Sequence, residues 1–160
     1  MTSIKLRAFS LAPLAVMALM TAAAPVWAQS QAQPRLETTS LTAGMFLIRA
    51  EVAVTAEQQA TGMMFRREMG DNEGMLFINT DSQVRCFWMR NTLVPLTIAF
   101  IADDGQIVNL ADMQARSEQS HCSAKPVRYA LEMRQGWFAK KGIKAGFKLR
   151  GGPFKEPAER

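Results

Sequence analysis

Several polar and aromatic side chains have the chemistry to bind a small ligand together. The set is Arg66, Arg67, Trp88, Arg90, Asn91, Thr92 and Glu132. Arginine forks match carboxylate, phosphate or sulfate groups, and tryptophan offers a flat face to a sugar ring or a cation. A simpler interpretation stays open for 90–92, because Asn tolerates a left-handed backbone and Thr can bond nearby backbone groups. That segment is therefore expected to form either a ligand site or only a turn.

The sequence contains no complete catalytic motif. It has no nucleophile elbow, phosphate-binding loop, HExxH or spaced CxxC, and no pattern that indicates a cofactor. The one histidine, His121, lies beside Cys122, which makes it a poor candidate for an oriented general base. Glu132 is a lone acid in an apolar segment. A salt bridge to an arginine is the favoured role for Glu132, and acid catalysis together with an arginine is the alternative.

Cys86 and Cys122 are the only cysteines. An oxidising compartment favours their pairing as a disulfide. Such a bridge would close a loop of about 37 residues and stabilise the fold by roughly 3–4 kcal/mol in the chain-entropy model. A soft-metal site of both cysteines, His121 and a methionine is the competing hypothesis. It is disfavoured because adjacent His and Cys lack the usual ligand spacing.

Residues 1–28 have the pattern of a signal peptide with cleavage after Ala28. Basic residues at 5 and 7 precede an apolar stretch over 8–24, and small residues stand before the expected cut. The stretch is short for a membrane span, although a retained anchor is the alternative. We therefore expect a periplasmic or secreted protein that meets a membrane only through this peptide. The basic residues are spread along the chain, so nucleic acid is not an expected partner.

The remaining chain is expected to form one domain over 45–150, between a flexible leader at 29–44 and a polar tail at 151–160. Alternating apolar residues predict a half-buried strand over 46–54. The run Thr55–Gln58 has the pattern of a capping box and predicts a helix over about 56–64. Gly62 weakens a helix, so we expect this one to end or deform near it.

The segment 86–100 is expected to be two core strands that meet at the polar turn 90–92. Asp104-Gly105 predicts a tight hairpin. Further short strands are expected at 75–78, 106–110, 129–133 and 147–149, and a second short helix at 136–142. Many short strands with one or two brief helices indicate a mainly-β fold, either a small sandwich or a partly open barrel.

Four blocks resemble, in order, a family of small bacterial and archaeal proteins known as domain of unknown function 192. The blocks are EQQATGMMFR at 57–66, EGMLF at 73–77, FWMRNTLVPL at 87–96 and YALE at 129–132. The resemblance spans about 45–150 and implies a compact, mainly-β, often exported domain without an established activity or cofactor. Two positions depart from the family pattern: Thr97 stands in place of an aspartate, and Gly146-Phe147 in place of Gly-Asp.

Three functional hypotheses follow from these features. The first is a periplasmic binding or accessory module for an anionic or sugar-like component of the cell envelope. The second is an envelope hydrolase that uses Glu132 with an arginine. The third is a structural or interaction protein without a small-molecule site, whose partner would be an envelope protein.

Overall fold

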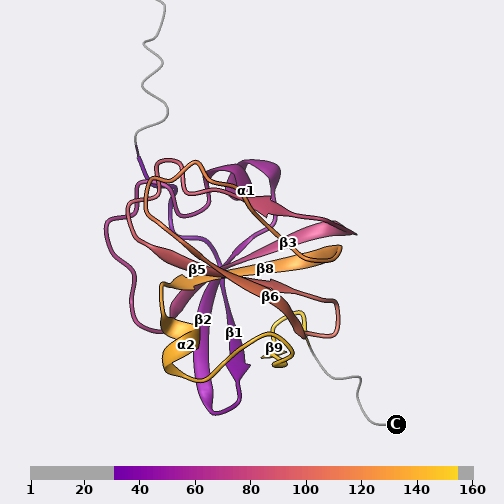
Figure 1. Cartoon of the computed structure of the whole chain (residues 1–160). Coiled ribbons are helices and arrows are strands. Elements are labelled where there is room, and N and C mark those ends of the chain that lie inside the picture. Colours follow the sequence, from indigo (N-terminus) through magenta and orange to yellow (C-terminus); the bar gives the residue numbers. More distant parts are fainter. Residues whose placement is uncertain (1–30, 155–160) are drawn as a thin grey trace, which may run out of the picture.

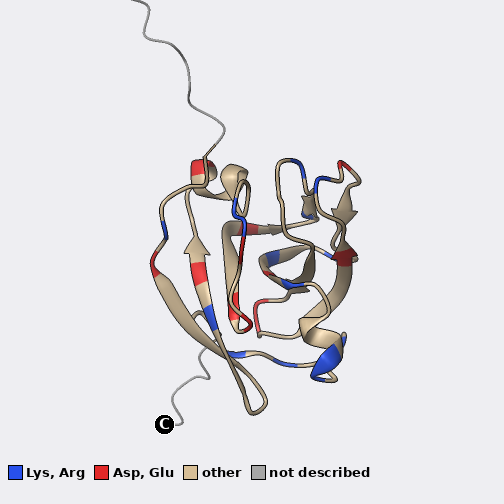
Figure 2. Ribbon diagram, turned by 90° about the vertical axis from the view of Figure 1, so that its left-hand side faces the viewer, with Lys and Arg blue, Asp and Glu red and all other residues tan. Residues whose placement is uncertain are grey.

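The computed structural model describes residues 31–154 (Figure 1). The predicted signal peptide at 1–28 lies outside the described residues. Within the described range, no helix is both long enough and apolar enough to cross a membrane. Acidic and basic residues are interspersed over several elements, with a basic cluster on the second helix (Figure 2).

One curled seven-stranded sheet forms most of the structure, in the order β6-β5-β8-β3-β2-β1-β9. Its strands are β1 Thr38–Ala43, β2 Phe46–Ala53, β3 Glu73–Gln83, β5 Leu96–Ile101, β6 Ile107–Met113, β8 Val127–Arg134 and β9 Arg150–Gly151. The start of the edge strand β6 is hydrogen-bonded to the segment before β9, with Ile107 N donating to Phe147 O at 2.8 Å and Leu149 N to Gly105 O at 2.9 Å. These bonds draw the two edges together. The prediction of a mainly-β, partly open barrel is confirmed.

A second, two-stranded sheet pairs β4, Cys86–Phe87, with β7, His121–Cys122. The expectation of a core strand before the 90–92 turn is therefore wrong. Cys86 is exposed and Phe87 only half buried, because this pair of strands lies outside the main sheet. The strand after the turn, β5, is buried along its whole length and was predicted correctly.

Both faces of the main sheet are covered, and each carries its own apolar cluster. Along β8, Leu131 and Met133 belong to one cluster and Ala130 to the other. Because side chains alternate along a strand, Glu132 shares the face of Ala130. Helix α2, Trp137–Lys140, covers the first face. The loops around Met63 and Met89 cover the second, so the carboxyl of Glu132 lies among apolar residues.

The connection from β2 to β3 explains the one parallel strand pair of the main sheet. Helix α1, Ala56–Thr61, begins at the predicted capping box, in which Gln58 N donates to Thr55 Oγ1 at 3.2 Å. It ends at Gly62, as predicted, because Gly62 takes φ 47° and does not continue the helix. A crossover of this length is what parallel pairing requires, whereas a tight hairpin joins only antiparallel strands.

Both ends of the domain extend further than predicted. Residues 38–43 of the expected flexible leader form β1, which pairs antiparallel with β2 through the turn at Gly44. At the other end the last strand is 150–151 rather than 147–149. The expected polar tail contributes Phe154, whose ring centroid lies 4.9 Å from that of Tyr129. Paired strand edges and this buried ring hold both segments against the core.

Candidate functional site

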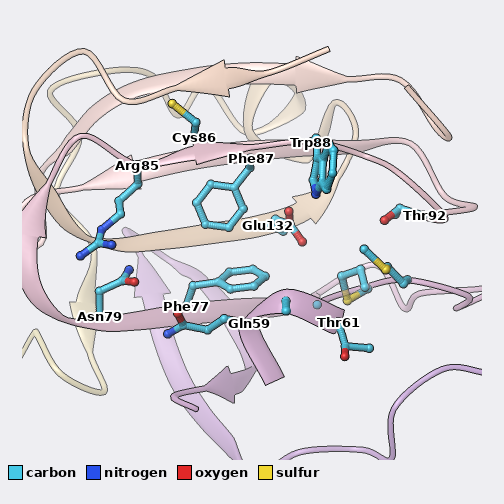
Figure 3. A pocket seen from close by; sticks show the side chains of 14 residues that line it. Gln59, Thr61, Phe77, Asn79, Arg85, Cys86, Phe87, Trp88, Thr92 and Glu132 are labelled. Carbon is cyan, nitrogen blue, oxygen red and sulfur yellow. The ribbon is translucent and has the colours of Figure 1, made fainter. Parts of the chain in front are cut away.

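A cavity of about 310 Å³ opens on the second face of the sheet, between α1 and the β4 segment (Figure 3). Its lining combines aromatic rings with polar side chains. The residues that matter most are Gln59, Phe77, Asn79, Phe87, Trp88 and Glu132. Phe77 and Phe87 meet edge to face, with ring centroids 4.9 Å apart. A mixed lining of this kind is typical of small-molecule sites.

Glu132 is the buried acid of this cavity. It is 4 % exposed, and it takes part in no ion pair among the described residues, so the predicted salt bridge is wrong. Burial raises the pKa of Glu132 to about 8, because the charged form loses its hydration. At neutral pH the side chain is therefore a carboxylic acid, which can donate one hydrogen bond and accept others.

Two side-chain amides are held in fixed orientations at the cavity. Gln59 Nε2 donates to Ala53 O at 3.2 Å and to Ile78 O at 2.8 Å. Asn79 Nδ2 donates to Arg128 O at 3.0 Å. These bonds use the amide nitrogens, and neither carbonyl oxygen receives a hydrogen bond from a residue in the described range. The two amide oxygens can therefore accept hydrogen bonds from a ligand.

Trp88 forms part of the wall and remains 49 % exposed despite its size. The guanidinium carbon of Arg90 lies 5.8 Å from the centroid of its ring, within the range of a cation–π contact. Arg90 Nε also lies 3.8 Å from a carboxylate oxygen of Glu118, and both side chains are exposed. The indole thus keeps a large free surface beside a weakly paired cation.

The segment 90–92 is a turn and also borders the cavity. Asn91 adopts φ 59°, as expected for a left-handed asparagine, and Thr92 N donates to Met89 O at 2.9 Å. Thr92 is 4 % exposed and lines the cavity, whereas Asn91 lies outside it. The turn interpretation and the lining role are therefore compatible.

Arg66 and Arg67, which were predicted as ligand-binding residues, do not lie among the residues that line the cavity. Arg66 is buried, and its Nη2 lies 2.8 Å from Glu51 Oε2. Neither Arg66 nor Arg67 lines the cavity. An arginine that we did not predict, Arg85, lies at one end of it instead and is paired with Asp81 (Figure 3). The sequence signal that could have identified Arg85 is its position directly before Cys86, which also lines the cavity.

The predicted disulfide is present between Cys86 and Cys122, which face each other across β4 and β7. Both sulfurs are bonded, so neither serves as a thiolate metal ligand. Cys86 itself lines the cavity. The bridge therefore fixes the strand that carries Phe87 and leads into Trp88.

Replacing both cysteines with serine should lower the free energy of unfolding by roughly 3–4 kcal/mol, because a loop of about 37 residues is no longer closed in the unfolded chain. Urea unfolding of the oxidised protein, the reduced protein and the double variant would measure this. The reduced protein and the double variant should agree. Equal stability of all three would show that the bridge does not constrain the fold.

The fold and the cavity together define the class of protein. It is a small β half-barrel with a buried glutamic acid in a cavity whose wall is aromatic. The chain belongs to the DUF192 family, described as "Uncharacterized ACR", whose model matches residues 39–151. This confirms the resemblance drawn from the four sequence blocks. The comparison with curated proteins finds no match.

Two solved structures are similar to this chain. A protein described as a candidate transcription regulator from Sinorhizobium meliloti is 31 % identical, with 76 % of this chain and 98 % of that chain covered and a TM-score of 0.72. A protein of unknown function from Novosphingobium aromaticivorans is 38 % identical, with 71 % and 83 % covered and a TM-score of 0.66. These similarities support the fold and the family and assign no activity.

The departure from the family pattern at Thr97 lies away from the cavity. Thr97 pairs with Met133 across the sheet, so its side chain shares the face opposite Glu132. Its Oγ1 donates to Asp112 Oδ1 at 2.5 Å and accepts from Gly136 N at 3.1 Å. The hydroxyl therefore has a structural role on that face, and the cavity is unaffected by the change.

Proposed function

We propose that this protein is an exported binding module for a neutral, sugar-like component of the cell envelope. The observation that carries the proposal is the Glu132 carboxyl buried in a cavity whose wall is the half-exposed Trp88, where burial raises the pKa of that carboxyl to about 8. A pyranose ring has an apolar face that suits an indole. Its rim of hydroxyls suits a carboxylic acid, which both donates and accepts hydrogen bonds.

Hydrogen-bond polarity favours a sugar over an anion. The amide oxygens of Gln59 and Asn79 accept hydrogen bonds, which the hydroxyl groups of a sugar can donate and a carboxylate or fully ionised phosphate cannot. The arginines near the cavity already face acids, with Arg85 beside Asp81 and Arg90 beside Glu118. Each of these two cations therefore has an acidic partner, which weakens its attraction for a charged ligand.

The same geometry favours binding over hydrolysis. Most glycoside hydrolases use two carboxyl groups on either side of the scissile bond. Among the described residues, Glu132 is the one acid in the lining of this cavity. A hydrolase that uses Glu132 with Arg85 stays the alternative, and it predicts turnover of the bound sugar.

Export to the periplasm is part of the proposal. A disulfide on the cavity wall supports an oxidising compartment. Acidic and basic residues are interspersed along the described chain (Figure 2), which argues against nucleic acid as the partner. The processed N-terminus of protein recovered from the periplasm tests this point, and intact residues 1–28 in a reduced cytoplasmic protein would contradict it.

Thermal-shift and calorimetric titration of the exported protein against N-acetylglucosamine, glucose, galactose and inorganic phosphate would test the ligand class. A sugar at a hundred times its dissociation constant should stabilise the fold by roughly 2.7 kcal/mol. Trp88→Ala should weaken sugar binding at least tenfold, because the stacking face is lost. The control Leu47→Ala removes another exposed apolar side chain, which does not line the cavity. This variant should bind sugar normally.

Phosphate binding without sugar binding would overturn the sugar assignment. Normal sugar affinity in Trp88→Ala would overturn the site. If none of the four compounds binds and Trp88→Ala changes only stability, the structural-protein hypothesis replaces this proposal.

A further inference from the structure

A second and larger cavity, of about 580 Å³, adjoins the first at Trp88. Four residues line both cavities: Ala60, Thr61, Met64 and Trp88. We call the first the inner cavity and the second the outer cavity. Since they share a wall rather than lying on separate faces, a ligand seated on Trp88 can extend from one into the other.

The N-terminal segment forms one wall of the outer cavity through Gln31, Gln33 and Pro34. Hydrogen bonds hold this wall in place. Gln33 Nε2 donates to Gln58 O at 3.1 Å and to Gly62 O at 2.9 Å, at the end of α1. The wall is therefore anchored to the helix that borders both cavities.

The opposite wall contains unusual backbone. Phe65 and Asn91 are non-glycine residues with φ 61° and 59°, and both line the outer cavity. Phe65 N donates to Asn91 O at 2.9 Å, so the two left-handed residues hold each other. Such conformations concentrate at ligand sites, where the surrounding structure maintains them. This pair is a second observation, independent of cavity size, that points to a site.

The lining of the outer cavity repeats the chemistry of the inner one. It offers side-chain amides from Gln31, Gln33 and Asn91 beside the rings of Phe65 and Trp88. Its two charged residues, Glu57 and Arg90, have opposite signs. Amide groups, flat apolar faces and little net charge suit a second sugar unit.

We propose that the outer cavity is a second subsite, so that the ligand is an oligosaccharide of at least two units. One unit lies against Glu132 and Trp88, and the next lies between the N-terminal segment and the turn at Asn91. This inference rests on the proposed sugar-binding function. It adds a chain-length preference that the inner cavity alone would not produce.

Calorimetric titration with N-acetylglucosamine, its β-1,4-linked dimer and its trimer, and with glucose and cellobiose, would test the second subsite. An oligomer should bind at least tenfold more tightly than its monomer. Asn91→Gly removes the amide while keeping a residue that adopts positive φ freely. Together with Gln31→Ala it should reduce that advantage to less than threefold and leave the monomer dissociation constant within twofold, because neither side chain lines the inner cavity.

Asn79→Ala is the matched control in the inner cavity. It should weaken monomer and oligomer alike and leave their ratio unchanged. Equal affinities of monomer and oligomer for the wild type would overturn the second subsite while leaving sugar binding intact. An outer-cavity variant that weakens the monomer as much as the oligomer would also overturn it. If no sugar binds, the proposed function fails first and this inference with it.

Discussion

Glu132→Gln should make the protein several kcal/mol more stable at alkaline pH while leaving its stability near pH 4.5 unchanged. Burial raises the pKa of Glu132 from 4.5 to about 8. Each pKa unit corresponds to about 1.4 kcal/mol, so the full effect above pH 8 is about 5 kcal/mol. Glutamine has nearly the same shape and carries no charge at any of these pH values.

The direction follows from proton counts. Between the two pKa values the folded protein keeps the proton of Glu132, while the unfolded chain has lost it. Stability therefore falls by about 1.4 kcal/mol per pH unit in that window. The contribution of protonated Glu132 to the free energy of unfolding is fully present below the pKa of the unfolded chain. It is lost as the pH rises through the pKa of the folded protein.

Urea unfolding of the wild type and of Glu132→Gln at several values between pH 4.5 and 9 would measure the difference. The two curves should diverge steadily with increasing pH. Parallel curves would show that Glu132 ionises normally in the folded protein, and the carboxylic-acid donor in the proposed site would then be wrong.

Glu51→Leu should destabilise the fold by about 3–5 kcal/mol, because it leaves the buried guanidinium of Arg66 without its partner. Glu51 accepts bonds at 2.7 Å from Arg35, 2.8 Å from Arg66 and 2.8 Å from Leu36 N. Arg66→Met should cost less, about 1–3 kcal/mol, since the carboxylate keeps its other two donors.

The double variant Glu51→Leu/Arg66→Met should recover part of the loss, because no buried charge remains unpaired. Chemical unfolding of the three variants measures this, and titration with any sugar that binds the wild type checks function. Arg66→Met should bind normally. A loss of affinity without a loss of stability would return Arg66 to the ligand site.

The local features of this fold could be predicted from sequence. The capping box at 55–58, the alternation along 46–54 and the hairpin at Gly105 each depend on a few neighbouring residues. The parallel pairing of β2 with β3 could not be predicted in this way, since it depends on how 54–72 crosses the sheet. β1 was missed because threonine and serine dominate it, although Leu41 and Ala43 alternate as buried residues.

Site residues could be predicted where the residue type itself is distinctive. They could not be predicted where the role of a residue depends on which other side chains it contacts. Trp88, Thr92 and Glu132 stood out by type and do line the inner cavity. Arg66 has equally distinctive chemistry, but its role depends on Glu51, a buried acid on a strand face expected to be polar. Gln59 was missed because an amide in a helix gives no signal of what it faces.

The two walls of the outer cavity have a consequence for how relatives of this protein can diverge. The floor of the inner cavity is Glu132, set in the most buried strands, where substitutions disturb packing on both faces of the sheet. The wall made by 31–34 contributes little to the core. Under the proposed two-subsite binding, changes in that wall would alter the preference for the second unit and leave recognition of the first unit and the barrel intact.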